Sequence, residues 1–391
     1  MPILNKYIMR VLIVGGGFGG CSSAEILSHN KKNKITLIEK SNILGAGVRT
    51  HFYGGHPYTY GPRHFLTRKK ETYTYLKKFL NLRNCNYHQF KSYVEQDNQF
   101  YNYPINWSDI EKMPDKKIIK KELSKSKINN PKNLEEFWIQ SVGKKLFGKI
   151  IDKYNKKMWL VDSCKKIDTF KWSPKGYTIK KGNQAAFDDW ISCYPTHKDG
   201  YNRYFDKILK LKNVKVKFNN NISKVNLKKR YVISSKKKYF FDVLINTISP
   251  DEILNFKYGK LKFIGRDLHK IVFPVKEVFP KDVFFLYYPN SENFTRLVEY
   301  KKFTKHKSNT SLVGMEVPSL NGRYYPIPIS KEHKLAKKYF NDFTYNTFSI
   351  GRAGTYRYEV DIDDCIWQSL EIKKILEKKS WQGPIVGEEF K

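Results

Sequence analysis

The chain has 391 residues, of which 40% are hydrophobic and 15% aromatic, which is enough for a sizeable core in two or three packed units and excludes a disordered chain. Its 73 basic and 37 acidic residues give a formal charge of +36. Lysine is scattered and no nucleic-acid-binding module is recognisable, so we attribute this charge to general lysine enrichment and expect no nucleic-acid partner. No stretch of about 18 apolar residues predicts a membrane span.

Five cysteines are widely spaced and form no CxxC pair. This spacing predicts neither a disulfide framework nor a metal site, and it is typical of a reducing compartment. The first ten residues are too short and too polar for a signal peptide. We therefore expect a cytoplasmic protein.

The N-terminal region predicts one βαβ unit. Residues 11–14 (VLIV) form the continuous apolar run of a buried parallel strand, and a glycine run follows at once. Residues 22–27 are expected to be helical, and residues 34–39 form a second strand that ends in Glu39.

The rest of the chain alternates between segments with a helical pattern and segments with a strand pattern. We expect a loop over 44–62, which is rich in Gly, His and Tyr. The expected helices lie at 71–82, 110–158 (with a break at 129–131), 201–211 and 361–376. The expected strands lie at 100–105, 214–218, 222–225, 231–234 and 243–245, followed by short strand-like runs over 261–326, including 271–273 and 283–288.

This order predicts an α/β protein with α+β insertions. A discontinuous Rossmann-type FAD-binding domain would comprise residues 1–84, 197–250 and 340–391. A helical insertion would span 107–163. An antiparallel-sheet substrate domain would comprise 85–106, 164–196 and 251–339.

The glycine run carries a dinucleotide-binding motif, Gly15-x-Gly17-x-x-Gly20. Gly15 permits the strand-to-helix turn, Gly17 lets a pyrophosphate approach the helix N-terminus, and Gly20 permits close helix–strand packing. Glu39, 24 residues beyond Gly15, is placed to accept hydrogen bonds from ribose hydroxyls. The glycine-containing loop at Gly45 and the absence of a second GxGxxG favour FAD over NAD.

The C-terminal segment GRAGTYRY, residues 351–358, precedes the last expected helix. A GRxG segment at this point brings backbone N–H groups and the guanidinium of Arg352 toward a flavin pyrophosphate or ribityl chain. Asp361 or Asp363 would cap the N-terminus of the closing helix.

Seven segments occur in a fixed order along nearly the whole chain. They are the glycine run with Glu39, YTYGP at 58–62, YPIN at 103–106, YNKKMW at 154–159, FTRLVEYKKF at 294–303, YYP at 324–326 and GRAGTYRY. With these segments in this order, the chain resembles the UDP-galactopyranose mutase family.

The resemblance implies an isomerase that interconverts pyranose and furanose forms of a nucleotide-diphosphate sugar. It implies a flavin that must be reduced and that attacks the sugar through its N5 atom, with no net redox change. Such enzymes supply galactofuranose for cell-surface polysaccharides. A homodimer is also expected.

The resemblance also assigns residues. Arg296, Tyr325 and Tyr358 match the catalytic groups that hold the diphosphate, and Tyr154 and Trp159 match the aromatic patch beside the base. The flavin-contacting positions would be Gly15, Gly17, Phe18, Gly20, Glu39, Lys40, Gly45, Tyr60, Gly61, Arg352, Asp361 and Ile362. As alternatives, the aromatic residues pack in the core, and Arg296 forms a surface ion pair with Glu299 or Glu316.

Two departures from the family pattern stand out. The family has a His-x-x-His segment after Gly-Pro, whereas this chain has Arg63-His64-Phe65-Leu66, so Leu66 replaces a histidine beside the flavin. The family's second diphosphate arginine, on a lid, is missing, and Lys171 or Lys175 would replace it as a point charge.

Two other functions remain open at this point. A flavin oxidoreductase of the amine-oxidase or desaturase type would explain Leu66 and the missing arginine, because an apolar substrate needs no phosphate clamp. A non-enzymatic nucleic-acid-binding module would use the positive charge.

Overall fold

The computed structural model describes residues 8–169, 179–187, 189–378 and 385–386. A six-stranded sheet forms one half of the molecule, in the order β10-β2-β1-β14-β20-β21, and every pairing in it is parallel. Its strands are β1 (Met9–Val14), β2 (Asn33–Ile38), β10 (Val214–Lys217), β14 (Val243–Asn246), β20 (Thr347–Ser349) and β21 (Ile385–Val386). The predicted Rossmann-type unit is confirmed.

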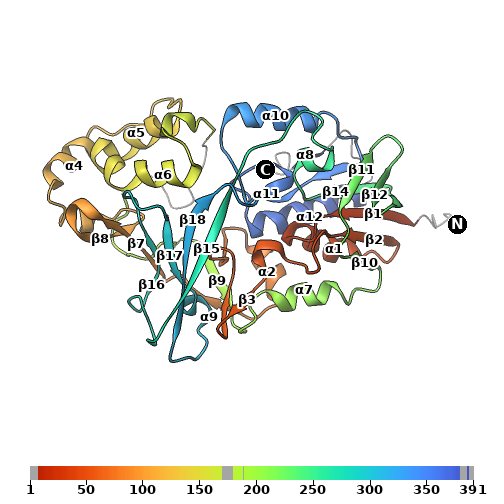
Figure 1. Ribbon diagram of the computed structural model, residues 1–391, viewed down its shortest axis with the longest axis horizontal. Coiled ribbons are helices and arrows are strands. Elements are labelled where there is room, and N and C mark those ends of the chain that lie inside the picture. The colour runs from red at the N-terminus through yellow and green to blue at the C-terminus, as the bar shows by residue number, and fades with distance from the viewer. Residues whose placement is uncertain (1–7, 170–178, 188, 379–384, 387–391) are drawn as a thin grey trace.

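Two helices lie side by side against this sheet (Figure 1). The first, α1 (Phe18–Ser28), follows the glycine run. The second, α12 (Ile362–Lys378), is the last helix among the described residues. The hydroxyl of Ser369 lies 2.8 Å from that of Ser22 and 2.9 Å from that of Ser23. These small side chains let the two helices approach closely, so the start of α12 is held near the start of α1.

The second half of the molecule is built on a seven-stranded sheet, in the order β19-β15-β18-β17-β16-β7-β8. Its strands are β7 (Gln89–Val94), β8 (Gln99–Tyr103), β15 (Phe263–Phe273), β16 (Val283–Tyr287), β17 (Arg296–Glu299), β18 (Ser311–Ser319) and β19 (Tyr325–Pro326). The predicted antiparallel sheet is confirmed, with one parallel pairing, between β16 and β7. The Phe90 and Phe285 rings, 4.6 Å apart, pack across that pair.

The helical insertion forms a separate lobe at the far end from the Rossmann-type sheet (Figure 1). Its elements are α3 (Trp107–Ile110), α4 (Lys116–Leu123), α5 (Leu134–Leu146), the π-helical segment Phe147–Ile151 and α6 (Asp152–Trp159). The Lys149 ammonium, 4% exposed, lies 2.6 Å from Asp97 and 2.9 Å from Asp115. This buried ion pair ties the lobe to the short turn between β7 and β8.

The remaining elements connect these parts. The strands are β3 (His51–Tyr53), β4 (His56–Tyr58), β5 (Phe65–Thr67), β6 (Leu82–Asn84), β9 (Ile191–Pro195), β11 (Ile222–Asn226), β12 (Tyr231–Ser234) and β13 (Lys237–Phe240). The helices are α2 (Lys70–Lys77), α7 (Asn202–Ile208), α8 (Pro250–Ile253), α9 (Lys301–Thr304), α10 (Ser330–Phe340) and α11 (Gly351–Gly354).

The expectation that residues 44–62 form a loop is wrong for part of that stretch. β3 and β4 make a hairpin there, and Gly54 and Gly55 turn it with φ angles of 54° and 78°. Positive φ at two successive residues is the requirement of a tight hairpin turn, which glycine meets without strain.

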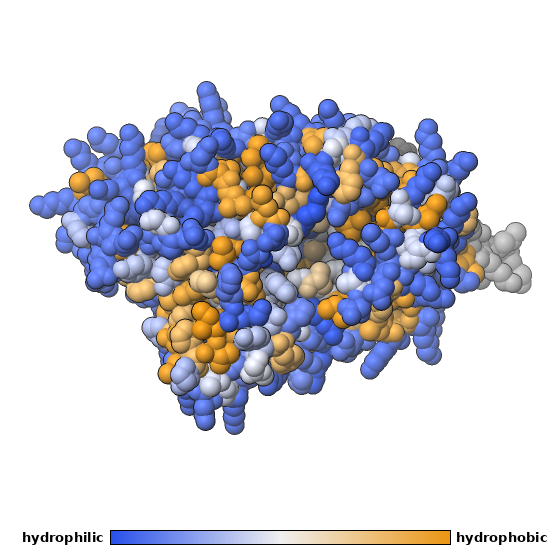
Figure 2. Space-filling view, viewed as in Figure 1, coloured by the Kyte–Doolittle hydropathy of each residue, from blue (hydrophilic) through white to orange (hydrophobic). Residues whose placement is uncertain are grey.

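Hydrophilic residues cover most of the face in Figure 2, in keeping with the charge. Among the helices of the described residues, none has the length and apolar character needed to cross a membrane. All five cysteines are buried and carry free thiols.

Candidate active site

The glycine run forms an open cradle at the N-terminus of α1. Gly15 adopts a φ of 100°, and a side chain there would overlap Thr247. A side chain at Gly20 would overlap the carbonyl of Gly15. Gly17, by contrast, has only Ala46 near its missing Cβ, at 3.7 Å. The backbone at Gly17 therefore leaves room for the close approach that a pyrophosphate at a helix N-terminus requires.

Glu39 is held beside this cradle. Its carboxylate accepts hydrogen bonds from the backbone N–H groups of Gly16, at 2.6 Å, and Ser41, at 2.7 Å. The loop that follows returns to the cradle, where the amide of Gly45 donates to the carbonyl of Gly16 at 2.8 Å. Both contacts position the second-strand loop next to the glycine run, so these residues fit a bound dinucleotide.

A cavity lies where the start of α12, the segment after β4 and the large sheet meet. It brings together residues that are widely separated along the chain, from Pro62 to Ile362. The predicted site residues that line it are Tyr154, Arg296, Tyr325, Arg352, Tyr358, Asp361 and Ile362. Tyr60 and Gly61 line a second, smaller pocket that shares Arg63, Arg266, Glu316 and Tyr325 with the first.

Arg296 forms the central ion pair of the cavity. Its Nη2 lies 2.8 Å from Oε2 of Glu316, and the two residues are cross-strand partners in β17 and β18. The side chains are 17% and 2% exposed, so this is a buried pair and not the surface pair considered as an alternative. Burial, the largest single influence, would lower the pKa of Arg296, but the Glu316 carboxylate and the hydroxyls of Tyr287, Tyr154 and Tyr325 together raise that pKa well above its usual value.

Tyr325 and Tyr358 stand side by side, with ring centroids 5.6 Å apart, but their hydroxyls are tuned in opposite directions. Burial raises the pKa of the Tyr358 hydroxyl, with a further contribution from Tyr325. For Tyr325 burial acts in the same direction, yet the guanidinium groups of Arg63, Arg296 and Arg266 outweigh it and lower the pKa. The Tyr325 hydroxyl is therefore a better hydrogen-bond donor to an anion.

Arg352 is fixed by the residues just before α12. Its Nε donates to the carbonyl of Val360 at 2.9 Å, and its Nη2 lies 3.3 Å from Oδ1 of Asp361. Its guanidinium carbon lies 5.3 Å from the Tyr325 ring centroid and 5.7 Å from that of Tyr358. Asp361 immediately precedes α12, whereas Asp363 lies inside its first turn, so the capping alternative for Asp363 is wrong.

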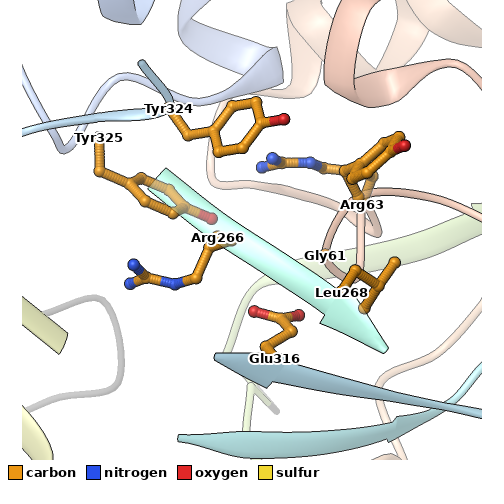
Figure 3. A pocket seen from close by; sticks show the side chains of 8 residues that line it. Gly61, Arg63, Arg266, Leu268, Glu316, Tyr324 and Tyr325 are labelled. Carbon is orange, nitrogen blue, oxygen red and sulfur yellow. The ribbon is translucent and has the colours of Figure 1, made fainter. Parts of the chain in front are cut away.

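Sequence reasoning missed three charged residues of the cavity wall as site residues, Arg63, Arg266 and Glu316. Arg266 lies over the Tyr325 ring, with its guanidinium carbon 4.8 Å from the centroid. Glu316 entered only as an alternative ion-pair partner of Arg296. Figure 3 shows Arg63, Arg266 and Glu316 gathered around the same pocket as Tyr325. For Glu316 the available signal was a lone charge within its strand, SLVGMEVPS, whereas the strand of Arg266, FIGRDLHKIVF, contains other charged residues and gave no such signal.

The comparisons with known proteins bear on this cavity. A family model described as UDP-galactopyranose mutase matches residues 149–358, more than half of the chain, including the segments that carry Arg296, Tyr325 and Tyr358. The chain belongs to the UDP-galactopyranose mutase family. It is therefore an isomerase, a mutase that interconverts pyranose and furanose forms of a nucleotide-linked sugar. A second model, described as an NAD(P)-binding Rossmann-like domain, matches residues 13–81.

Individual relatives extend over nearly the whole chain. The dTDP-fucopyranose mutase of Escherichia coli is 24% identical over 405 residues, which cover 95% of this chain and 99% of that protein. The UDP-galactopyranose mutase of Mycoplasma genitalium is 25% identical over 402 residues, 94% and 95% of the two chains.

Solved structures share the fold. A reduced UDP-galactopyranose mutase superposes with a TM-score of 0.78 at 17% identity, covering 95% of this chain and 96% of the other. A putative protoporphyrinogen oxidase from Exiguobacterium sp. superposes with a TM-score of 0.69 at 13% identity, covering 95% and 99%.

The other residues predicted from the family resemblance lie away from the cavity or outside the described part of the chain. Lys40 is exposed beside the cradle. Trp159 is buried in the core of the helical lobe, with its ring centroid 4.8 Å from that of Tyr358, so it supports the cavity from behind. Lys171 and Lys175 lie outside the described residues.

Proposed function

We propose that this member of the mutase family uses FAD in its reduced form and acts on a nucleotide-diphosphate sugar in the cavity. The observation that carries the proposal is the meeting of Arg296, Tyr325 and Tyr358 beside a dinucleotide cradle. When bound, the reduced flavin supplies the nucleophile that opens the sugar–phosphate bond.

The protein's own residues hold the leaving diphosphate. Arg296 presents a planar guanidinium with several donors, and this group suits two phosphate oxygens at once. Glu316 orients it from behind through the 2.8 Å ion pair. The Tyr325 hydroxyl, with its lowered pKa, donates a further hydrogen bond as negative charge develops on the diphosphate.

The cofactor would extend from the cradle into the cavity. Gly15, Gly17 and Gly20 leave room for the pyrophosphate, and Glu39 lies next to the place that a ribose would occupy. Arg352, Asp361 and Ile362 line the cavity at the start of α12, where the helix dipole favours negative charge. Those three residues are proposed to contact the flavin ring.

The charged lining weighs against the oxidoreductase alternative. Four arginines, Arg63, Arg266, Arg296 and Arg352, line one cavity, and their burial is costly unless an anion enters it. An apolar substrate would leave the positive charge of the arginines that have no carboxylate partner in the described part of the chain uncompensated. The aromatic residues Phe90, Phe187 and Phe285 line the same space and would pack against the cofactor and the base.

Two further expectations accompany the proposal. Five buried free thiols suit a reducing compartment such as the cytoplasm. A homodimer stays a prediction, to be checked by light scattering of the purified protein.

The proposal is tested by cofactor identity and reductant dependence together. The purified protein is heated to release its cofactor, which is compared with FAD and FMN by chromatography. The untreated protein is then incubated with nucleotide sugars, with and without dithionite. One FAD per chain and furanose formation only with dithionite support the proposal, whereas an FMN-loaded or colourless protein contradicts it.

A further inference from the structure

Arg63 occupies a fixed place between the cofactor loop and the cavity. The turn before it is built by Gly61, with a φ of 81°, and by the Thr59 hydroxyl, which donates to the carbonyl of Gly61 at 2.5 Å. The Tyr300 hydroxyl holds the same turn through the carbonyl of Thr59 at 2.8 Å. Because the backbone is tied on both sides, the direction of the Arg63 side chain is set before any ligand binds.

The Arg63 side chain connects the two halves of the site. Its Nε donates to the carbonyl of Gly47 at 3.2 Å, in the loop whose Gly45 bonds back to the glycine cradle. Arg63 lines both pockets around Tyr325, and Figure 3 shows its side chain at the smaller one. A dinucleotide that begins at the cradle and ends in the cavity must pass this guanidinium.

Arg63 differs from two other cavity arginines in having no carboxylate partner among the described residues. Arg296 is paired with Glu316 and Arg352 with Asp361. The one hydrogen bond that Arg63 makes there is to a backbone carbonyl, through Nε, which leaves its two terminal nitrogens directed at the cavity. A charge that is partly buried and unpaired lowers the energy of any anion placed next to it.

We propose that Arg63 is the cation that stabilises the negative charge of the reduced flavin, in place of the family histidine that Leu66 replaces. The reduced isoalloxazine is an anion near neutral pH, with its charge on N1 and the C2 carbonyl, and a nearby positive charge raises the flavin's reduction potential. Leu66, which faces the same cavity from β5, cannot supply a hydrogen bond or a charge. This inference rests on the proposed use of FAD.

Sulfite is the probe for this charge, because it adds to N5 of oxidised flavin and places a negative charge at N1 without any substrate or turnover. We compare the purified, flavin-loaded wild type with Arg63→Gln and Arg63→Lys. The matched control is Arg68→Gln, which removes an arginine from the end of the same segment. Arg68 is 62% exposed, pairs with Asp189 at 2.5 Å and lies over Trp190.

The expected result is a sulfite dissociation constant about tenfold higher in Arg63→Gln, the size of one partly screened charge contact. In a two-electron couple this corresponds to a midpoint potential about 30 mV lower. Arg63→Lys keeps the charge and should stay within about threefold of wild type, and Arg68→Gln should match wild type.

Other outcomes overturn the inference. Unchanged sulfite affinity in Arg63→Gln, with weaker binding of UDP or dTDP, would make Arg63 a phosphate ligand. An equal loss in Arg63→Lys would make its role one of shape and not of charge. If Arg63→Gln fails to retain flavin, the inference is tested by the sulfite affinity of Arg63→Lys and by the relative affinity of the apoprotein for oxidised and reduced FAD. A wild type without FAD would contradict the proposed function itself, and so the two failures are distinguishable.

Discussion

Replacing Arg296 by glutamine separates its structural role from its proposed role toward the diphosphate. The Glu316 side chain is 2% exposed, and its carboxylate lies 2.8 Å from Nη2 of Arg296. Removing the arginine leaves that charge buried and unpaired, which costs about 3–5 kcal/mol of stability. In the double variant Arg296→Gln/Glu316→Gln neither charge of this pair remains, so we expect most of this loss to be recovered.

Ligand binding should follow a different pattern. Loss of a guanidinium that holds two phosphate oxygens is expected to cost about 2–3 kcal/mol, or about 30- to 150-fold in the dissociation constant. We therefore expect Arg296→Gln and the double variant to bind UDP and dTDP weakly. Glu316→Gln keeps the arginine and should bind within about fivefold of wild type, since only the orienting contact is weakened.

Urea unfolding gives the stabilities and calorimetric titration of UDP and dTDP gives the affinities. If the double variant regains both stability and nucleotide affinity, Arg296 serves only as an ion-pair partner of Glu316, and the assignment of the diphosphate to this arginine is refuted. Equal loss of affinity in Glu316→Gln would instead place the carboxylate in direct contact with the ligand.

Three further predictions concern the cradle, the start of α12 and the helical lobe. Gly20→Ala places a methyl group on the Gly15 carbonyl and should abolish FAD loading, measured by absorbance. The control Gly148→Ala should load normally, because no atom elsewhere in the described residues lies within 4 Å of the missing Cβ of Gly148. Equal FAD loading of the two variants would refute the proposed cradle. Burial, with Asp364 and Asp361 adding to it, raises the pKa of Asp363 to about 7. A protein with an acid whose pKa is raised on folding loses stability as pH rises. From about pH 4 to 8 the free energy of unfolding of the wild type, measured in urea, should therefore fall by up to about 4 kcal/mol relative to that of Asp363→Asn. The same pH dependence in both proteins would contradict this. Lys149→Met strands the buried Asp97 carboxylate and should cost about 3–5 kcal/mol, seen as a lower melting temperature, whereas an unchanged one would mean that the pair is solvated.

The sequence predicts the parallel part of the fold well, for a physical reason. The run Val11–Val14 is buried on both faces, so it is apolar at every position, and the tight strand-to-helix turn after it requires glycine at Gly15 and Gly20. The strand Gln89–Val94 was missed because it reads QFKSYV, in which the polar Ser92 occupies a buried position and breaks the alternation of apolar and polar residues. The strand Lys237–Phe240 was missed because its lysines are exposed on an edge.

The site is predicted only where residues follow the family's order. Arg296 and Tyr325 were found in this way, and the structure places both in one cavity. Arg266 was not, because its contact with Tyr325 joins two strands nearly sixty residues apart, and no local pattern encodes that pairing. Glu316 meets Arg296 through cross-strand register, which depends on the whole β17–β18 pairing.

The central claim is that this cavity performs a flavin-dependent ring interconversion on a nucleotide sugar. The most direct test follows furanose formation by chromatography and the flavin absorbance together, under anaerobic conditions, with UDP-galactose, dTDP-fucose and GDP-sugars. We predict a furanose product from at least one of them, formed only by the dithionite-reduced protein and with the flavin still reduced at the end. Flavin bleaching by a substrate without dithionite, or no product from any sugar with FAD-loaded protein, would contradict the account.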